Sequence, residues 1–165
     1  METNRKTDMA WLSGFFDGEG TVRIASPNKR DLGHLEVSIV NTDKQIMNDI
    51  YAMFGGVGYL KSQKQKKKNH RIYYRWVIAS VEASKFLKLL QPWVQRKIVK
   101  EKVRVALEYQ DIKSENNGKF RKGNPASDEY REEMFNYWLY MRHLNARGVD
   151  LPKVDCPKAN SFRKK

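Results

Sequence analysis

Two carboxylates lie close together near the N-terminus, in the segment WLSGFFDGEG at residues 11–20. The apolar spacing predicts a buried helix that ends here, because Gly18 and Gly20 can release the chain from helical geometry. A helix C-terminus repels anions, so Asp17 and Glu19 are poorly placed for stability. Carboxylate oxygens beside free main-chain carbonyls are, however, the ligands that a hard divalent cation prefers. The alternative is a helix with a glycine cap whose two acids are only solvated.

Small residues also mark one face of this predicted helix. Gly14 and Gly18 are four positions apart, which places them on the same side, and Ser13 is beside them. A glycine inside a helix costs about 1 kcal/mol relative to alanine. We therefore expect a second backbone to approach this face closely.

The segment resembles the signature of the LAGLIDADG homing endonucleases. The motif positions are filled here by Leu12, Gly14, Asp17, Glu19 and Gly20, with Ser13, Phe15, Phe16 and Gly18 as variants. Glu19 stands where the family more often has Asp. Residues 41–43 (NTD), 54–59 (FGGVGY) and 90–97 (LQPWVQRK) follow in the family's order, so the resemblance covers about residues 9–105. Residues 112–165 match the family less well.

Charge and composition point to a nucleic acid as the partner. The chain has 165 residues and a formal net charge of +13, which favours binding to a polyanion. No apolar run is long enough to span a membrane, and no apolar signal segment begins the chain. We therefore expect an intracellular, soluble protein that does not bind membranes. The sequence does not indicate its compartment. Cys156 is the single cysteine, which excludes an intrachain disulfide and a cysteine-rich zinc site.

Alternating and helical patterns predict an α+β fold. We expect a helix from residue 7 or 8 to 18, strands at 21–26 and 34–40, a helix at 43–54, strands at 57–63 and 71–78, and helices at 80–90, 92–110 and 128–145. This is an αββαββα core at about 7–110, followed by a helical extension and a basic tail at about 111–165, all in one domain. The resemblance implies that the antiparallel sheet is curved and binds DNA.

One face of that sheet is predicted to be polar and basic. The side chains expected on it are Thr21, Arg23, His34, Glu36, Ser38, Lys61, Gln63, Arg71, Tyr73 and Arg75. Between Lys61 and Arg75 there are seven lysines and arginines and no acid. A solvated hairpin tip would explain this run, but uncompensated charges repel one another unless a polyanion neutralises them. Side chains on the strands can reach base edges, and the lysines of the hairpin would contact phosphates: Lys64, Lys66, Lys67 and Lys68.

The resemblance also implies a homodimer, since the motif occurs once. Residues 138–148, the nearest later candidate, lack both carboxylates. The interface would be the motif helix, through Leu12, Ser13, Gly14, Phe15, Asp17 and Gly18. The two Glu19 carboxylates would then meet at the twofold axis, and the DNA target would be nearly palindromic.

By the same resemblance, the activity would be Mg²⁺-dependent double-strand cleavage that promotes intron mobility. Glu19 and the Gly18 carbonyl would hold the metal, and Lys97 would act near the scissile phosphate. Asp43 would help to order solvent, whereas we interpret Asp17 as a structural residue. Without the resemblance, Lys97 would be a solvated helix lysine.

Two other functions fit much of the same sequence. One is a maturase, which would bind intron RNA on the same fold. The other is a sequence-specific DNA-binding regulator, which would need the sheet and its lysines but not Glu19. The presence of both Glu19 and Lys97 favours the nuclease.

Overall fold

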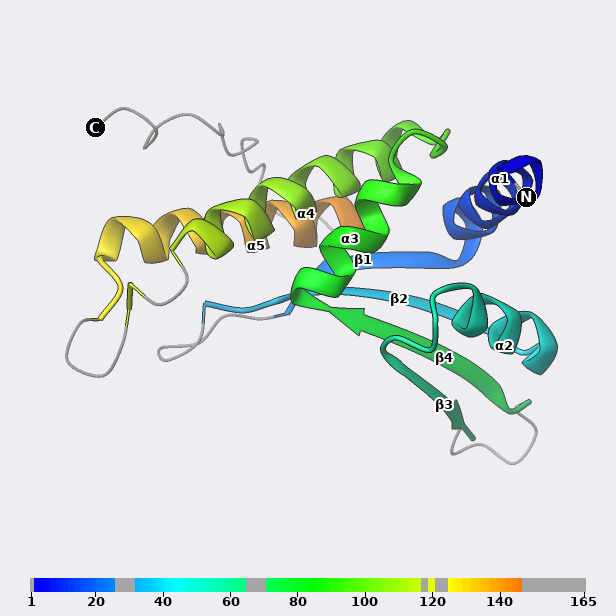
Figure 1. Ribbon diagram of the computed structural model, residues 1–165. Coiled ribbons are helices and arrows are strands. Elements are labelled where there is room, and N and C mark those ends of the chain that lie inside the picture. The colour runs from blue at the N-terminus through cyan, green and yellow to red at the C-terminus, as the bar shows by residue number, and fades with distance from the viewer. Residues whose placement is uncertain (1, 26–31, 65–70, 117–118, 121–124, 147–165) are drawn as a thin grey trace.

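The chain folds into a four-stranded sheet covered by helices (Figure 1). The computed structural model describes residues 2–25, 32–64, 71–116, 119–120 and 125–146. The elements are α1 (Glu2–Glu19), β1 (Gly20–Ile24), β2 (Leu35–Asn41), α2 (Lys44–Met53), β3 (Tyr59–Gln63), β4 (Tyr73–Ala79), α3 (Ser80–Leu90), α4 (Lys97–Glu115) and α5 (Asp128–Asn145). The predicted α+β class and αββαββα order, with added C-terminal helices, are confirmed.

The sheet is antiparallel, with the strand order β1-β2-β4-β3. The first strand pairs with the second so that Gly20 lies opposite Ile39. Figure 1 shows α3, α4 and α5 along one side of the sheet and α1 at the start of β1. Helix α2 packs against β2 and β4 on the same side, through Met47 and Ile50 of the core. In the part of the chain that is described, no helix covers the other side, which is the open face of the sheet.

Apolar side chains from the helices and from one face of the sheet form the core. An aromatic group lies at its centre, where the rings of Phe54 and Trp76 stack at 5.4 Å and Phe86 meets Trp76 edge-on at 5.2 Å. Leu12 and Phe16 of α1 are fully buried there. In the described residues, no helix combines the length and apolarity needed to cross a membrane.

Two helices differ from their predicted bounds by several residues, and α2 differs by one residue at each end. The first begins at Glu2, because the polar residues that precede the motif have adequate helix propensity. The fourth spans Lys97–Glu115, not 92–110, and residues 91–96 form a turn and an extended segment before it. Its last turn is secured by Asn116, whose side chain donates to the Ile112 carbonyl at 2.9 Å.

The last helix, α5, covers the edge of the sheet at β1. Tyr130, Met134, Tyr137 and Met141 point into the core. At its C-terminal end, the Asn145 side-chain amide donates to the main-chain carbonyl of Val22 at 2.8 Å. Helix α5 of the C-terminal extension is therefore packed against the core.

The motif glycine at the junction of α1 and β1 is required by packing. A Cβ on Gly20 would lie 2.2 Å from the ring of Phe16 and 2.5 Å from the Phe16 carbonyl oxygen. Phe16 is fully buried and has no space to retreat. We expect Gly20→Ala to lower the free energy of unfolding by about 1–3 kcal/mol, as overpacking of a core does.

Gly18→Ala is the matched control in the same motif, since nothing lies within 4 Å of a Cβ placed there. Within a single protomer it should be neutral or stabilise by up to about 1 kcal/mol. Urea denaturation of both variants measures the difference. Equal stabilities would contradict a close α1–β1 junction.

Candidate functional site

The end of α1 exposes a carboxylate beside main-chain carbonyls. Glu19 is the last residue of the helix, and both Gly18 and Glu19 are exposed to solvent. The last carbonyls of a helix have no partner within it, so oxygen ligands of two kinds are available here. The strand β1 starts at the next residue, which joins this carboxylate directly to the sheet.

Asp17 connects the end of α1 to the start of α4. One carboxylate oxygen of Asp17 accepts hydrogen bonds from the backbone N–H groups of Gln95 at 2.9 Å and Arg96 at 3.3 Å. The Arg96 guanidinium in turn donates to the Asp17 carbonyl at 2.7 Å. Asp17 is buried within its own chain. It is therefore structural, and it is not available for a dimer interface, where the sequence placed it.

This connection brings the segments of two predicted site residues together. Lys97 is the first residue of α4, two positions after Gln95, and Glu19 is two positions after Asp17. Lys97 is exposed, at a helix start where the backbone dipole is positive. A bound anion would be favoured beside it.

Asp43 has a capping role in the structure. Its carboxylate is the N-cap of α2 and accepts from the backbone N–H groups of Gln45 at 2.8 Å and Ile46 at 3.1 Å. It follows Asn41, the last residue of β2, at the end of the sheet where β1 leaves the motif helix. Asp43 therefore has a structural function as a helix cap. Its position also allows the predicted role in ordering solvent.

We expect Asp17→Ala to lower the free energy of unfolding by about 1–3 kcal/mol. The substitution leaves two backbone N–H groups at the start of α4 without their carboxylate partner, and unmade hydrogen bonds of buried groups carry that cost. Chemical denaturation measures it. Asp49→Ala is the control, because Asp49 is exposed on α2 and bonds only the Gln45 side chain within the described residues. A change no larger than that of the control would remove Asp17 from the framework of the site.

The residues on the exposed face of α1 are not all those predicted for it. Leu12 and Ser13 are buried in the core of their own chain, so they were wrongly assigned to a dimer interface. The exposed stripe contains Trp11, Gly14 and Gly18, with Phe15 half-buried at its margin. The rings of Trp11 and Phe15 stack at 5.5 Å, and Trp11 is 45% exposed. An aromatic group of this kind beside open glycines is a surface suited to a second helix.

The polar face of the sheet has the predicted phase. The pairing of the strands puts the following side chains on the open side: Thr21, Arg23, Glu36, Ser38, Lys61, Gln63, Tyr73 and Arg75. His34 and Arg71 lie just before β2 and β4, and Lys64 just after β3. Lys66, Lys67 and Lys68 fall outside the described residues. Arginine, lysine, glutamine and tyrosine thus share one open surface.

Glu36 and Ser38 are buried on this face, which the sequence did not predict. Arg23 donates hydrogen bonds from Nε and Nη2 to the Glu36 carboxylate, both at 2.8 Å. Arg75 donates from Nη2 to the same carboxylate at 2.9 Å. The pairing of the strands puts Ser38 opposite Val77, between Glu36 and the position opposite Arg75. The Arg75 side chain must pass over Ser38 to reach Glu36. Neither Glu36 nor Ser38 is therefore free to contact a base.

The Glu36 carboxylate also stabilises the charged form of Arg23. Its hydrogen bonds, with a coulombic contribution, raise the pKa of the Arg23 guanidinium above its ordinary value against the opposing effect of burial. Like any arginine, Arg23 carries its positive charge at every physiological pH. The negative charge of Glu36 neutralises one of the two positive charges that Arg23 and Arg75 bring to this point of the sheet.

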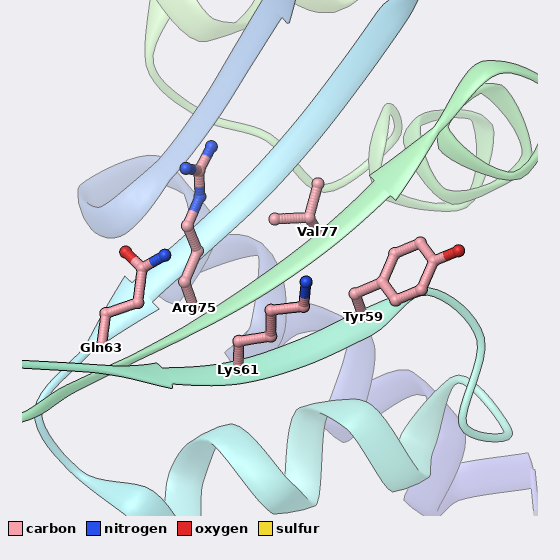
Figure 2. Close-up of a pocket in the computed structure, with 5 residues that line it drawn as sticks. All are labelled: Tyr59, Lys61, Gln63, Arg75 and Val77. Atoms are coloured by element: carbon pink, nitrogen blue, oxygen red, sulfur yellow. The ribbon is translucent and has the colours of Figure 1, made fainter.

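A pocket of about 230 Å³ lies between β3 and β4 on the open face. Figure 2 shows its lining side chains rising from these strands on one side of the sheet: Tyr59, Lys61, Gln63, Arg75 and Val77. The Tyr73 hydroxyl donates to the Gln63 side chain at 2.5 Å, and Lys61 lies 5.6 Å from the centre of the Tyr59 ring. Donors on a ribbon of two strands can reach base edges in a major groove.

Comparison of the sequence with models of protein families identifies the family of this chain. The model for a LAGLIDADG-like domain matches residues 6–91, which is more than half of the sequence. The chain belongs to the LAGLIDADG homing endonuclease family. The match includes the motif helix, the whole sheet and α3, so the family assignment covers Glu19 and the open face of the sheet but not Lys97 at the start of α4. No curated protein matches the sequence.

Solved LAGLIDADG structures share the fold. The homing endonuclease I-CvuI, in complex with its target in the presence of calcium, superposes with a TM-score of 0.67 at 15% identity over 90% of this chain and 89% of its own. The archaeal intron-encoded homing endonuclease I-Vdi141I, complexed with DNA, gives 0.64 at 11% identity over 91% of both chains. The DNA-bound LAGLIDADG homing endonuclease I-GzeII gives 0.60 at 14% identity, but only 43% of its length is covered.

The residues at the motif fit a divalent metal only in part within one LAGLIDADG chain. In the described residues, no three His, Cys, Asp or Glu side chains form a cluster that could hold a metal ion. One chain offers the Glu19 carboxylate and the carbonyls at the end of α1. Magnesium takes one or two protein carboxylates and completes its shell with water and substrate phosphate, so such an open oxygen site suits it.

Two residues of the LAGLIDADG site were missed from the sequence. Gln95 and Arg96 bind Asp17 and set the start of α4, but their segment was interpreted as part of a helix. The signal was present in LQPWVQRK at residues 90–97, where Pro92 interrupts the helical pattern. A helix starting after this segment leaves its first backbone N–H groups in need of an acceptor, and Asp17 supplies one.

Proposed function

We propose that the chain is a site-specific homing endonuclease that makes a Mg²⁺-dependent double-strand break in DNA. One observation carries the proposal: the exposed Glu19 lies one residue before a sheet whose open face is lined by basic and polar side chains. A regulator would need that face alone, and nothing in its function would require a carboxylate at this junction. Intron mobility would be the consequence of such cleavage.

The open face of the sheet binds the DNA duplex in this proposal. Arg23, Lys61, Gln63 and Arg75 enter the major groove, where guanidinium, ammonium and amide donors meet base edges. Thr21, His34, Arg71 and Tyr73 lie at the margins of the same surface. The lysines of the β3–β4 hairpin, Lys64, Lys66, Lys67 and Lys68, neutralise phosphates and fix the register of the protein on the duplex.

The chemistry belongs to the end of α1 and the start of α4. The Glu19 carboxylate and the Gly18 carbonyl would hold the metal. A bound divalent ion lowers the pKa of a water molecule and stabilises the leaving oxygen in phosphodiester hydrolysis. Lys97 supplies a positive charge that stabilises the developing negative charge on the scissile phosphate. Asp43 orders solvent at the same end of the sheet.

A homodimer supplies the two active sites that a double-strand break needs. The chain holds one motif, and an exposed stripe of Trp11, Gly14 and Gly18 on α1 would pack against its copy. A twofold axis through these helices brings both Glu19 side chains together and makes the target nearly palindromic. This chain covers 89% of the I-CvuI chain but only 43% of the I-GzeII chain. These coverages support one chain as half of an active unit.

A cleavage assay tests the proposal. The wild-type protein is incubated with a duplex that carries the intron-less insertion site, with Mg²⁺ or with EDTA. The expected result is a double-strand cut that requires Mg²⁺. Tight DNA binding without a cut under any divalent metal would favour the regulator. Preferential binding of the intron RNA would favour the maturase.

A further inference from the structure

The acid at the centre of the open face calls for an explanation. Glu36 is 9% exposed, and its carboxylate lies where a polyanion would approach. An acid in such a place weakens binding to any DNA, because it cancels a positive charge. A buried ion pair is weak evidence of a stabilising role, because the free-energy cost of taking the charges out of water offsets their attraction, so stability alone is a weak reason for it.

The geometry of the Glu36 cluster, which consists of Arg23, Glu36 and Arg75, supplies a better reason. Glu36 occupies the Nε–H and one Nη2–H of Arg23. The donors left on Arg23 are those at the far end of the guanidinium, on Nη1 and Nη2. These two parallel donors match O6 and N7 of guanine, and the Arg23 side chain is 49% exposed and able to present them.

Arg75 is held in a related way. Its Nη2 donates to Glu36, and its Nε is buried without a hydrogen-bond partner among the described residues. The Arg75 side chain crosses from β4 over the neighbouring strand and lines the pocket with Lys61 and Gln63 (Figure 2). A flexible arginine would choose the nearest phosphate, whereas one held by a carboxylate keeps its remaining donors directed at one place in the groove.

We propose that Glu36 is a positioning residue that fixes Arg23 and Arg75 as readers of guanine in the DNA target. Glu36 itself contacts no base. It lowers general attraction to DNA by one charge and converts two mobile cations into oriented recognition groups. The inference rests on the proposed function only in that the open face binds duplex DNA, and it requires no cleavage.

The test is a binding selection from a randomised duplex library in EDTA, followed by affinity measurements on the selected duplex. The wild type should select guanines at two separate positions. Arg23→Lys and Arg75→Lys, which keep the charge but cannot form bidentate bonds, should each lose the preference at one of these positions by about tenfold or more. Both arginines are partly exposed, so we expect these variants to fold.

Glu36→Gln gives the decisive result. It should lose the guanine preference at both positions, bind random-sequence DNA more tightly than the wild type, and steepen the logarithmic salt dependence by about 0.9. The control is Glu82→Gln, which removes the same charge from an exposed ion pair with Lys85 on α3. The control should keep both guanines and the salt dependence. Thermal unfolding of each variant checks that the fold is retained.

Several outcomes would overturn the inference. Guanine preference that persists in Glu36→Gln, or an equal loss of affinity for target and random DNA, would show that Glu36 does not orient the arginines. A wild type that selects no sequence would refute it together with site-specific recognition. Selected guanines in a protein that never cuts DNA would refute the nuclease and leave this inference in place.

Discussion

Glu19→Gln should abolish double-strand cleavage while DNA binding stays the same or becomes slightly tighter. Glutamine keeps the size of the side chain but loses the charged oxygen that a hard cation needs. We expect the cleavage rate to fall by about 1,000-fold or more, the scale seen when a main electrostatic contact of an active site is lost. Binding depends on the sheet and not on Glu19, and removal of an acid near phosphates favours it.

The measurement compares single-turnover cleavage in Mg²⁺ with affinity in EDTA for the same duplex. Glu19→Asp is the matched control, because it retains the carboxylate and restores the residue that is more common in the family. Cleavage should survive in it, with an altered dependence on metal concentration. Unchanged cleavage in Glu19→Gln would place the metal elsewhere in the chain.

The second large effect is expected at Gly14. A side chain there begins in open space within the protomer, since Gly14 is exposed and nothing lies within 4 Å of a Cβ at this position. Replacement of a helical glycine also gains about 1 kcal/mol of helix propensity. The folded protomer should therefore be at least as stable as the wild type. The same side chain would block a second helix that approaches the stripe of Trp11, Gly14 and Gly18.

Gly14→Leu should hence be a folded monomer at concentrations where we expect the wild type to dimerise. Cleavage should fall by about 100-fold or more, because the two Glu19 groups are no longer held in register. Analytical ultracentrifugation and the cleavage assay measure the two effects. Ala52→Leu, which adds the same side chain to an exposed position on α2, is the control and should change neither. A Gly14→Leu variant that still dimerises and cuts would move the interface away from this face.

Local patterns were sufficient to predict much of the fold. The helices α3 and α5 have their predicted bounds, Ser80–Leu90 and Asp128–Asn145. The outward phase of Tyr73, Arg75 and Val77 is also confirmed by the strand pairing. These features follow from the periodicity of side chains within one element, which the sequence displays directly.

Features that depend on distant contacts could not be predicted in this way. Asp17 meets Gln95 across 78 positions, and Arg75 meets Glu36 across 39. The burial of Leu12 and Ser13 follows from which side of α1 faces the sheet, and a helix with apolar residues around much of its surface leaves that side undecided. The roles of Glu36 and Arg96 likewise become visible only when the partner strand or helix is in place. The metal, DNA and dimer roles of the site residues stay predictions.

The contact between α5 and β1 has a consequence for how the chain is made. The bond from Asn145 to Val22 joins residues 123 positions apart, so the first strand is covered by the last helix of the described residues. Such a contact forms late, because a long loop must close before it stabilises anything. During synthesis, the N-terminal hairpin emerges many seconds before its cover, with an unpaired strand edge that can join other chains. Production of the protein should therefore depend on chaperones or on slow, cool expression more than its size suggests.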